Sequence, residues 1–251
     1  MITIAEGVYI GVVFALGGAV HSLTGFGFAI VSALPLAFLF DVRTISLTML
    51  LVVQLLLVSV FYQTMRTTGL KIRWRTVAFP VAGTVVGRFV GIYLLERLPE
   101  EILLMLMSWV LLLIAGYFLF LERRVRLPQG LLAGASAGLL SGVFGGLFNF
   151  SGPPLVAYFR TATDSPAQFI ATLQVSFVAG VAISLGSHLW LGNFTARILA
   201  LAGTGGVGCI AGSFVGRWLF LKVHPHMFSR VVSYAMVAMT LALVASRFLG
   251  R

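Results

Sequence analysis

Charged side chains are scarce in this sequence. Only 10% of its 251 residues are Asp, Glu, Lys or Arg, whereas 59% are hydrophobic. A soluble domain of this composition could not cover its surface with polar groups, so the lipid bilayer must serve as its solvent. The composition therefore predicts an integral membrane protein.

Acidic residues are the rarer charged class, with seven Asp and Glu against seventeen Lys and Arg. All seven lie at the ends of apolar segments or in the joints between them, and none lies inside a span. Pathways for cations or protons usually place carboxylates at membrane depth, so this pattern favours an anionic substrate. The basic excess is typical of cytoplasmic loops, and we expect no nucleic acid among the partners.

Cysteine and the common catalytic motifs are also nearly absent. A single cysteine, Cys209, excludes a disulfide framework and a cysteine metal cluster. The sequence has no G-x-x-x-x-G-K-[ST] loop for ATP, no H-E-x-x-H zinc motif and no nucleophile elbow. We therefore expect neither an enzyme nor a resident cofactor or metal, and transport driven by a gradient fits better than transport driven by ATP.

What the sequence does contain is a succession of long apolar segments separated by short polar joints. A membrane-spanning helix needs roughly 20 apolar residues, and these runs lack the alternating polarity of membrane β-strands. The predicted fold is therefore all-α, with no joint long enough for a separate soluble domain. The predicted segments are 8–40, 44–64, 76–95, 102–121, 131–159, 169–191, 198–221 and 231–249.

Two segments, 8–40 and 131–159, exceed the length of a straight span, and both are interrupted midway. The first contains Gly25 and Gly27, and the second contains Gly152 followed by two prolines. Glycine frees the backbone and proline removes a hydrogen-bond donor, so each segment should break. One interpretation is a long, tilted and kinked helix. The other is a hairpin that enters the membrane and returns to the same side, which the distribution of Lys and Arg favours slightly.

The interruptions recur at matching places in two halves of the chain. A glycine-spaced block at 83–91 is matched at 208–216, and the glycine and proline of the first break are matched in the second. The sequence therefore predicts two transmembrane repeats, 1–126 and 127–251, of about four hydrophobic segments each within one membrane domain. The repeats would be inverted if both broken segments re-enter. Broken segments at corresponding places of two halves point to a transporter's binding site.

A half-helix that begins at membrane depth presents unpaired N–H groups and partial positive charge, which suit an anion. We therefore predict that the two breaks bind the substrate. The alternative interpretation is that small residues at these places only permit close helix packing. The predicted ligands are Asn149, Ser151, Gly152 and Pro153 from the second break, and Thr24, Gly25 and Gly27 from the first.

Four more polar side chains lie within apolar segments. Arg88, near the middle of its segment, is costly to bury and marks a functional site, unless it reaches the interface or binds backbone carbonyls. His21, one turn before the first break, could bind the anion or carry a proton. Gln54 and Gln174 could complete a polar lining. Hydrogen bonding between helices is the alternative for these last three.

The stretch from Gly145 to Val156, with the sequence GGLFNFSGPPLV, resembles the sulfite exporter TauE/SafE family, also called the toluenesulfonate uptake permeases. The Gly25-Phe26-Gly27-Phe28 break, followed by Pro35, is similar to the motif in the first half of that family. The resemblance extends over essentially the whole chain. It implies movement of sulfite, sulfoacetate or related organosulfonates across a bacterial cytoplasmic (inner) membrane.

Together these features predict a multi-pass secondary transporter that moves a small anion by alternating access. Its site would lie between the two broken segments, with a proton as the candidate coupling ion and a homodimer allowed. A passive anion channel is one alternative, and its flux would not saturate at modest substrate concentration. A non-transporting assembly or sensor component is the other, and it would show no flux.

Overall fold

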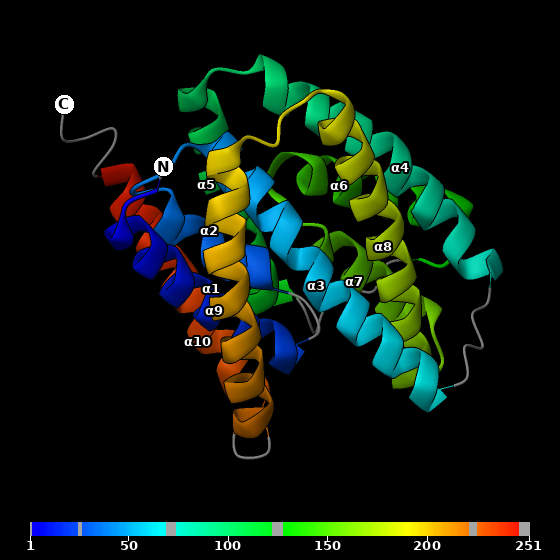
Figure 1. The fold of residues 1–251 in the computed structure, drawn as a ribbon. Helices are drawn as coiled ribbons and strands as arrows, with labels where there is room; N and C mark the ends of the chain where they lie inside the picture. The colour runs from blue at the N-terminus through cyan, green and yellow to red at the C-terminus, as the bar shows by residue number, and fades with distance from the viewer. Residues whose placement is uncertain (1, 25–26, 69–73, 122–127, 221–224, 246–251) are drawn as a thin grey trace. The chain divides into compact units, whose positions relative to one another are not determined.

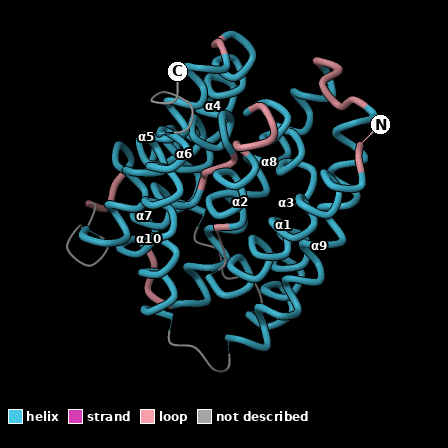
Figure 2. Tube along the Cα trace, turned by 90° about the vertical axis from the view of Figure 1, so that its left-hand side faces the viewer, coloured by secondary structure: helices cyan, strands magenta, loops and turns pink. Residues whose placement is uncertain are grey.

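A computed structural model describes residues 2–24, 27–68, 74–121, 128–220 and 225–245, and these ranges are almost entirely helical (Figures 1 and 2). No strand occurs within them, so the predicted all-α fold is confirmed. The helices are α1 (Ile4–Thr24), α2 (Phe28–Leu36), α3 (Val42–Thr68), α4 (Trp74–Arg97), α5 (Glu100–Gly116), the π-helical η1 (Tyr117–Leu121), α6 (Leu131–Phe148), α7 (Gly152–Ala162), α8 (Pro166–Trp190), α9 (Ala196–Phe220) and α10 (Pro225–Val244).

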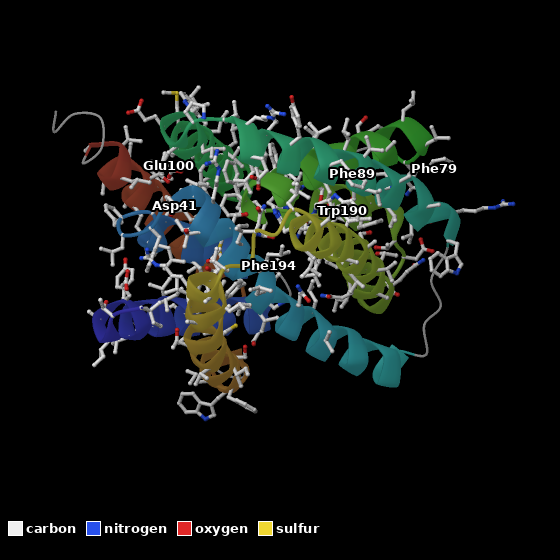
Figure 3. The ribbon with its side chains drawn as sticks, turned by 45° about the horizontal axis from the view of Figure 1, so that its top comes forward. Asp41, Phe79, Phe89, Glu100, Trp190 and Phe194 are labelled. Atoms are coloured by element: carbon white, nitrogen blue, oxygen red, sulfur yellow. The ribbon has the colours of Figure 1, made fainter. Side chains whose placement is uncertain are left out.

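Six helical segments in the described part of the chain are long and apolar enough to cross a membrane, namely α1, α4, α5 with η1, α6, α8 and α9. They also carry large apolar side chains on their outer faces. Phe79 and Phe89 on α4, for example, are both exposed (Figure 3). Exposed aromatic side chains along a spanning helix are suited to contact with lipid, so the chain is a multi-pass membrane protein.

The chain divides into two compact units. Unit 1 comprises Met1–Val52, Leu98–Arg124 and Thr195–Arg251, and unit 2 comprises Val53–Arg97 and Val125–Phe194. Each unit takes segments from both predicted repeats, so the units and the repeats divide the chain differently. The duplication at residue 126 stays a prediction.

Unit 2 is built around the contact between α4 and α6, with α8 packed against α4. Three glycines on α4 make this contact possible, because a Cβ atom at any of them would collide with backbone atoms of α6. Small residues let two helix backbones approach closely in a membrane, where van der Waals packing replaces the hydrophobic effect. The glycines Gly83, Gly87 and Gly91 face the carbonyl oxygens of Ala135, Leu139 and Val143, respectively.

Unit 1 is built around the contact between α1 and α9, with α2 packed against α1 and α10 against α2 and α5. Here the glycines of α9 approach the backbone of α1. A hydrogen bond also joins the start of α3 to the start of α5: the Val42 amide donates to Glu100 Oε1 over 2.9 Å, and Figure 3 shows Asp41 and Glu100 in this region. The glycines Gly208, Gly212 and Gly216 face the carbonyl oxygens of Gly11, Ala15 and Ala19.

Candidate anion site around Arg88

The second long segment is broken between α6 and α7. Asn149 ends α6 in the left-handed conformation, at φ 62°, which Asn tolerates better than most residues. Its amide donates to the Gly145 carbonyl over 3.0 Å, and the Phe150 amide donates to the Phe144 carbonyl over 3.2 Å. Helix α7 then starts at Gly152, with proline in its first turn. The segment is therefore two helices joined by a short break, and not one continuous kinked helix.

The first long segment is broken in the same manner. Helix α1 ends at Thr24, and α2 starts after Gly27, whose φ of 101° strongly favours glycine. The predicted ligand Gly25 lies outside the described residues. Gly27 is therefore required by the backbone at the start of α2, whatever else it does.

Arg88 is the central polar residue of unit 2. It lies on α4, and only 1% of it is exposed. Its Nη1 donates to the Gly145 carbonyl and to the Ser184 hydroxyl oxygen, each over 2.8 Å. Its Nη2 donates to the Ser151 hydroxyl oxygen over 2.6 Å. The guanidinium thus joins α4 to α6, to the break before α7, and to α8.

These three bonds do not use all of the donors of Arg88. A guanidinium has five N–H groups, and the Nε atom of Arg88 is buried without a hydrogen-bond partner among the described residues. Nε and Nη2 form one edge of the guanidinium, the edge that binds two oxygens of a carboxylate or phosphate side by side. Gly180 on α8 borders that edge, because a Cβ atom there would lie 3.0 Å from Nε and 3.3 Å from Nη2.

In the part of the chain that the structure describes, the charge of Arg88 has no partner of opposite sign. Within the described residues no carboxylate pairs with it, and its three partners are a carbonyl and two hydroxyl groups. Taking a cation out of water costs several kcal/mol, on the order of 2.5–3.5 kcal/mol on insertion scales for a helix centre. A site that keeps such a charge uncompensated is suited to receive an anion.

Ser151 is also held through its backbone. Its carbonyl oxygen accepts the Ser141 hydroxyl over 2.6 Å, which ties the break back onto α6. Its own hydroxyl accepts from Arg88 and keeps its proton free to donate. Arg88 and Ser151, which the sequence analysis identified on different grounds, are therefore in direct contact.

The other predicted ligands are spread over both units. Gly152 and Pro153 form the first turn of α7 in unit 2, next to Ser151. His21 lies in the last turn of α1 in unit 1, is 3% exposed, and has no partner for either ring nitrogen. Buried amide atoms without partners occur at Gln54 on α3 and Gln174 on α8. Neither glutamine hydrogen-bonds to Arg88 in the described part of the chain.

Sequence reasoning missed Ser184 and Gly180, which complete the surroundings of Arg88. Both belong to a buried row on α8 in which every fourth residue is small or polar. Residues four apart share one face of a helix, so this spacing was a signal within an otherwise apolar span. The row consists of Thr172, Ser176, Gly180, Ser184 and His188.

Comparison with known proteins gives a consistent result. A sequence model described as sulfite exporter TauE/SafE matches residues 9–243. A curated protein of Cupriavidus necator, named probable sulfite/organosulfonate exporter TauE, is 28% identical over 152 residues. That match covers 58% of each chain, so the present chain spans little more than half the length of this relative. No solved structure matches the chain.

Proposed function

Because the chain belongs to the sulfite exporter TauE/SafE family, we propose that it transports a small sulfur oxyanion, either sulfite or an organosulfonate such as sulfoacetate. The name of the Cupriavidus relative supports this substrate class. We place the protein in a bacterial inner membrane and assign it alternating access driven by an ion gradient, as the absence of an ATP-binding motif favours. It would act as a carrier and not as an enzyme.

The observation that carries the proposal is the buried, uncompensated charge of Arg88. Arg88 is held by neutral oxygen atoms from α6, the break and α8, and its Nε atom is unpartnered. A structural arginine in a membrane protein would be expected to pair with a carboxylate or to spend all its donors on carbonyls. This one keeps donors available on the edge that matches an oxyanion.

A sulfonate or sulfite group has three oxygen atoms arranged around sulfur. Two of them would accept the N–H groups of Nε and Nη2, and the third would accept the Ser151 hydroxyl. The start of α7 adds partial positive charge, although Pro153 and Pro154 remove two of its N–H donors and leave Gly152 as the first. The site would therefore rely on side chains more than on the helix terminus.

Flux into proteoliposomes of purified protein tests this function. We expect saturable uptake of sulfite, sulfoacetate or methanesulfonate, and little uptake of chloride, which cannot use a two-oxygen fork. Flux that does not saturate would support a channel instead. Folded protein that moves none of these anions would support the non-transporting assembly or sensor component.

Substituting the break residues tests the placement of the site. Ser151→Ala should weaken anion binding about tenfold or more, because a hydrogen bond to a charged group contributes about 1.5–3 kcal/mol. Asn149→Ala should also weaken binding while leaving the protein folded. Ser108→Ala is a suitable control, because Ser108 is also buried but donates only to the Leu104 carbonyl of its own helix. Unchanged affinity in both break variants would refute the placement.

A further inference from the structure

A second polar cluster lies in unit 2, where α4 and α8 end. Asn193 Nδ2 donates to Glu96 Oε1 over 2.6 Å and lies 3.0 Å from His188 Nδ1. His188 Nδ1 and Glu96 Oε1 are 3.8 Å apart. A carboxylate, an imidazole and an amide therefore meet within hydrogen-bonding reach, and the anion site described above uses none of them.

The turn that follows α8 places Asn193 beside Glu96 and His188. At the end of α8 the Leu191 amide donates to the Ser187 carbonyl, and Gly192 then adopts a φ of 69°. The Asn193 amide then returns to the His188 carbonyl over 3.0 Å. The turn thus holds the Asn193 side chain between the two titratable groups, and the ring of Phe194 packs edge-on against His188.

The cluster connects water with the buried interior. The side chain of Glu96 is 34% exposed, whereas that of His188 is 2% exposed. Trp190, two residues after His188, is 91% exposed and lies near Phe194 in Figure 3. Tryptophan is enriched where a membrane meets water, so Glu96 is placed to exchange protons with the solution and His188 to hold one further inside.

His188 is also linked to the anion site through α8. Ser184, which accepts a hydrogen bond from Arg88 Nη1, precedes His188 by one helical turn, about 6 Å along the axis. Within the described residues, Arg88 and Glu96 are the charged groups of α4 that interact with this region. Arg97 at the end of α4 instead lies over the ring of Tyr93.

Helices α6 and α7 also pack against α8, and among the described residues they show no ion pair with His188. Helix α6 contains no titratable residue. Helix α7 carries Tyr158 and Arg160, and the Tyr158 hydroxyl lies 3.5 Å from the Gly130 carbonyl before the start of α6. Helix α8 itself has no other ionisable side chain. Within the described residues, the charged groups nearest to His188 in this account are therefore Glu96, at 3.8 Å, and Arg88, which is linked to α8 through Ser184.

From this geometry we propose that Glu96, His188 and Asn193 form the binding site of the proton that is transported with the anion. The proposal rests on the proposed transport function. An anion bound at Arg88 and a proton bound at His188, one helical turn beyond Ser184, carry opposite charges, so each ligand favours the binding of the other, as linkage requires. One proton taken up with one monovalent anion leaves the charge of the loaded site unchanged. On protonation, His188 Nδ1 becomes a donor, and Glu96 Oε1, 3.8 Å away, is the carboxylate oxygen that can accept from it.

Methanesulfonate is a suitable probe, because it stays fully ionised over the range of about pH 5 to 8 in which histidine titrates. For the wild type, we expect an acidic exterior to accelerate its uptake into proteoliposomes. The apparent affinity should rise by up to about tenfold per pH unit as pH falls through the titration of one coupled group. His188→Gln should keep exchange of labelled for unlabelled methanesulfonate but lose the response to the proton gradient.

Direct proton counting distinguishes coupling from structural damage. In weakly buffered detergent solution, saturating methanesulfonate should drive uptake of up to one proton per wild-type molecule and none by His188→Gln. Glu96→Gln should slow the gradient response without changing exchange at fixed pH. Asp164→Asn is the control and should behave as wild type. It removes a carboxylate that lies just before the start of α8, whereas His188 lies in the last turn of that helix.

The outcomes separate the two proposals. Saturable flux with the same proton dependence in wild type and in His188→Gln would overturn the coupling site and leave the transport function standing. Loss of the gradient response in His21→Gln, with His188→Gln unaffected, would move the proton site to unit 1 and also overturn the proposal. Absence of any methanesulfonate or sulfite flux in wild type would overturn the transport function itself.

Discussion

Units 1 and 2 use the same backbone contact but place different polar groups beside it. In unit 2, Gly83 faces Ala135, and in unit 1, Gly208 faces Gly11. Ala135 follows Gly11 by 124 residues, and Gly208 follows Gly83 by 125. The same two offsets relate the contacts of Gly87 and Gly212, and those of Gly91 and Gly216.

The two units place their large polar side chain on opposite members of the helix pair. At these offsets Arg88 corresponds to Ser213, and Gly145 corresponds to His21. In unit 2, the helix with the long cation faces a glycine, and a Cβ atom at Gly145 would lie 2.7 Å from Arg88 Cζ. In unit 1, the hydroxyl of Ser213 donates to the Cys209 carbonyl over 2.8 Å, and the larger side chain, His21, is on the facing helix.

This comparison separates what packing determines from what it leaves free. Close glycine contact determines where a pair of helices leaves room for one large polar side chain. It does not determine which helix supplies that side chain or whether it carries a permanent charge. Unit 2 has a permanent cation held by three hydrogen bonds, whereas unit 1 has an imidazole with two unpartnered nitrogens.

The largest expected effects come from breaking the shared backbone contact. Gly87→Leu in unit 2 and Gly212→Leu in unit 1 should each destabilise the protein by about 3 kcal/mol or more, because overpacking against backbone cannot be relieved by rotating a side chain. Thermal unfolding in detergent measures the effect. Gly203→Leu, on α9 with nothing near its Cβ position, is the control. A destabilised control and stable contact variants would contradict the packing argument.

The next largest effect should come from making unit 2 resemble unit 1 at Arg88. Arg88→Ser should lower anion affinity by about 2–5 kcal/mol, since it removes a buried charge that binds the ligand. Binding of sulfite or methanesulfonate, followed calorimetrically, provides the measurement. Ser213→Ala at the corresponding place should change affinity little. Equal losses in the two variants would show that the units do not differ as proposed.

A smaller effect is expected from adding a methyl group beside the Nε–Nη2 edge of Arg88. In Gly180→Ala, the new Cβ atom would lie 3.0 Å from Nε and should weaken anion binding about tenfold, with folding retained. Gly186→Ala adds the same methyl group to α8 at a place with open space. Comparing the dissociation constants of the two variants tests whether Nε contacts the ligand. Identical constants would argue against that contact.

The smallest effect is expected in unit 1. His21→Gln should change anion affinity by no more than about twofold, because the described hydrogen bonds of Arg88 all lie within unit 2 and distant sites act almost independently. Flux measured over a range of substrate concentrations reports this change. A loss as large as that of Arg88→Ser would mean that both units bind the anion with comparable strength.

The sequence was sufficient to predict those features that depend on local chemistry. Apolar length predicted the six spanning segments, but the segments predicted at 44–64 and 231–249 are shorter apolar helices within the described residues. Gly27 and Pro153 predicted that both long segments break. Arg88 was identified because a charge in an apolar span is costly wherever it points. The contact between Arg88 and Ser151 could not be predicted in the same way, because it requires the fold to bring α4 against α6.

Features that depend on the partner helix could not be read from the sequence. Gly180 and Ser184 have meaning only because α8 presents them to Arg88, and a glycine or serine in an apolar helix is common. In the sequence, the two breaks are matched by their prolines, Pro35 and Pro154, which lie 119 residues apart. The packing instead relates α1 to α6 by 124 residues, because backbone contact depends on the glycines of the facing helices.

The interleaving of the two units has a consequence for biosynthesis. Helix α1 packs against α9, and about 170 residues separate the end of one from the start of the other. At a synthesis rate of about 5–20 residues per second, α1 waits roughly 10–35 s in the membrane before its partner emerges from the ribosome. During that interval its groove of Gly11, Ala15 and Ala19 faces lipid or the insertion machinery. A nascent chain stalled before α9 should therefore be a ready target for membrane proteases.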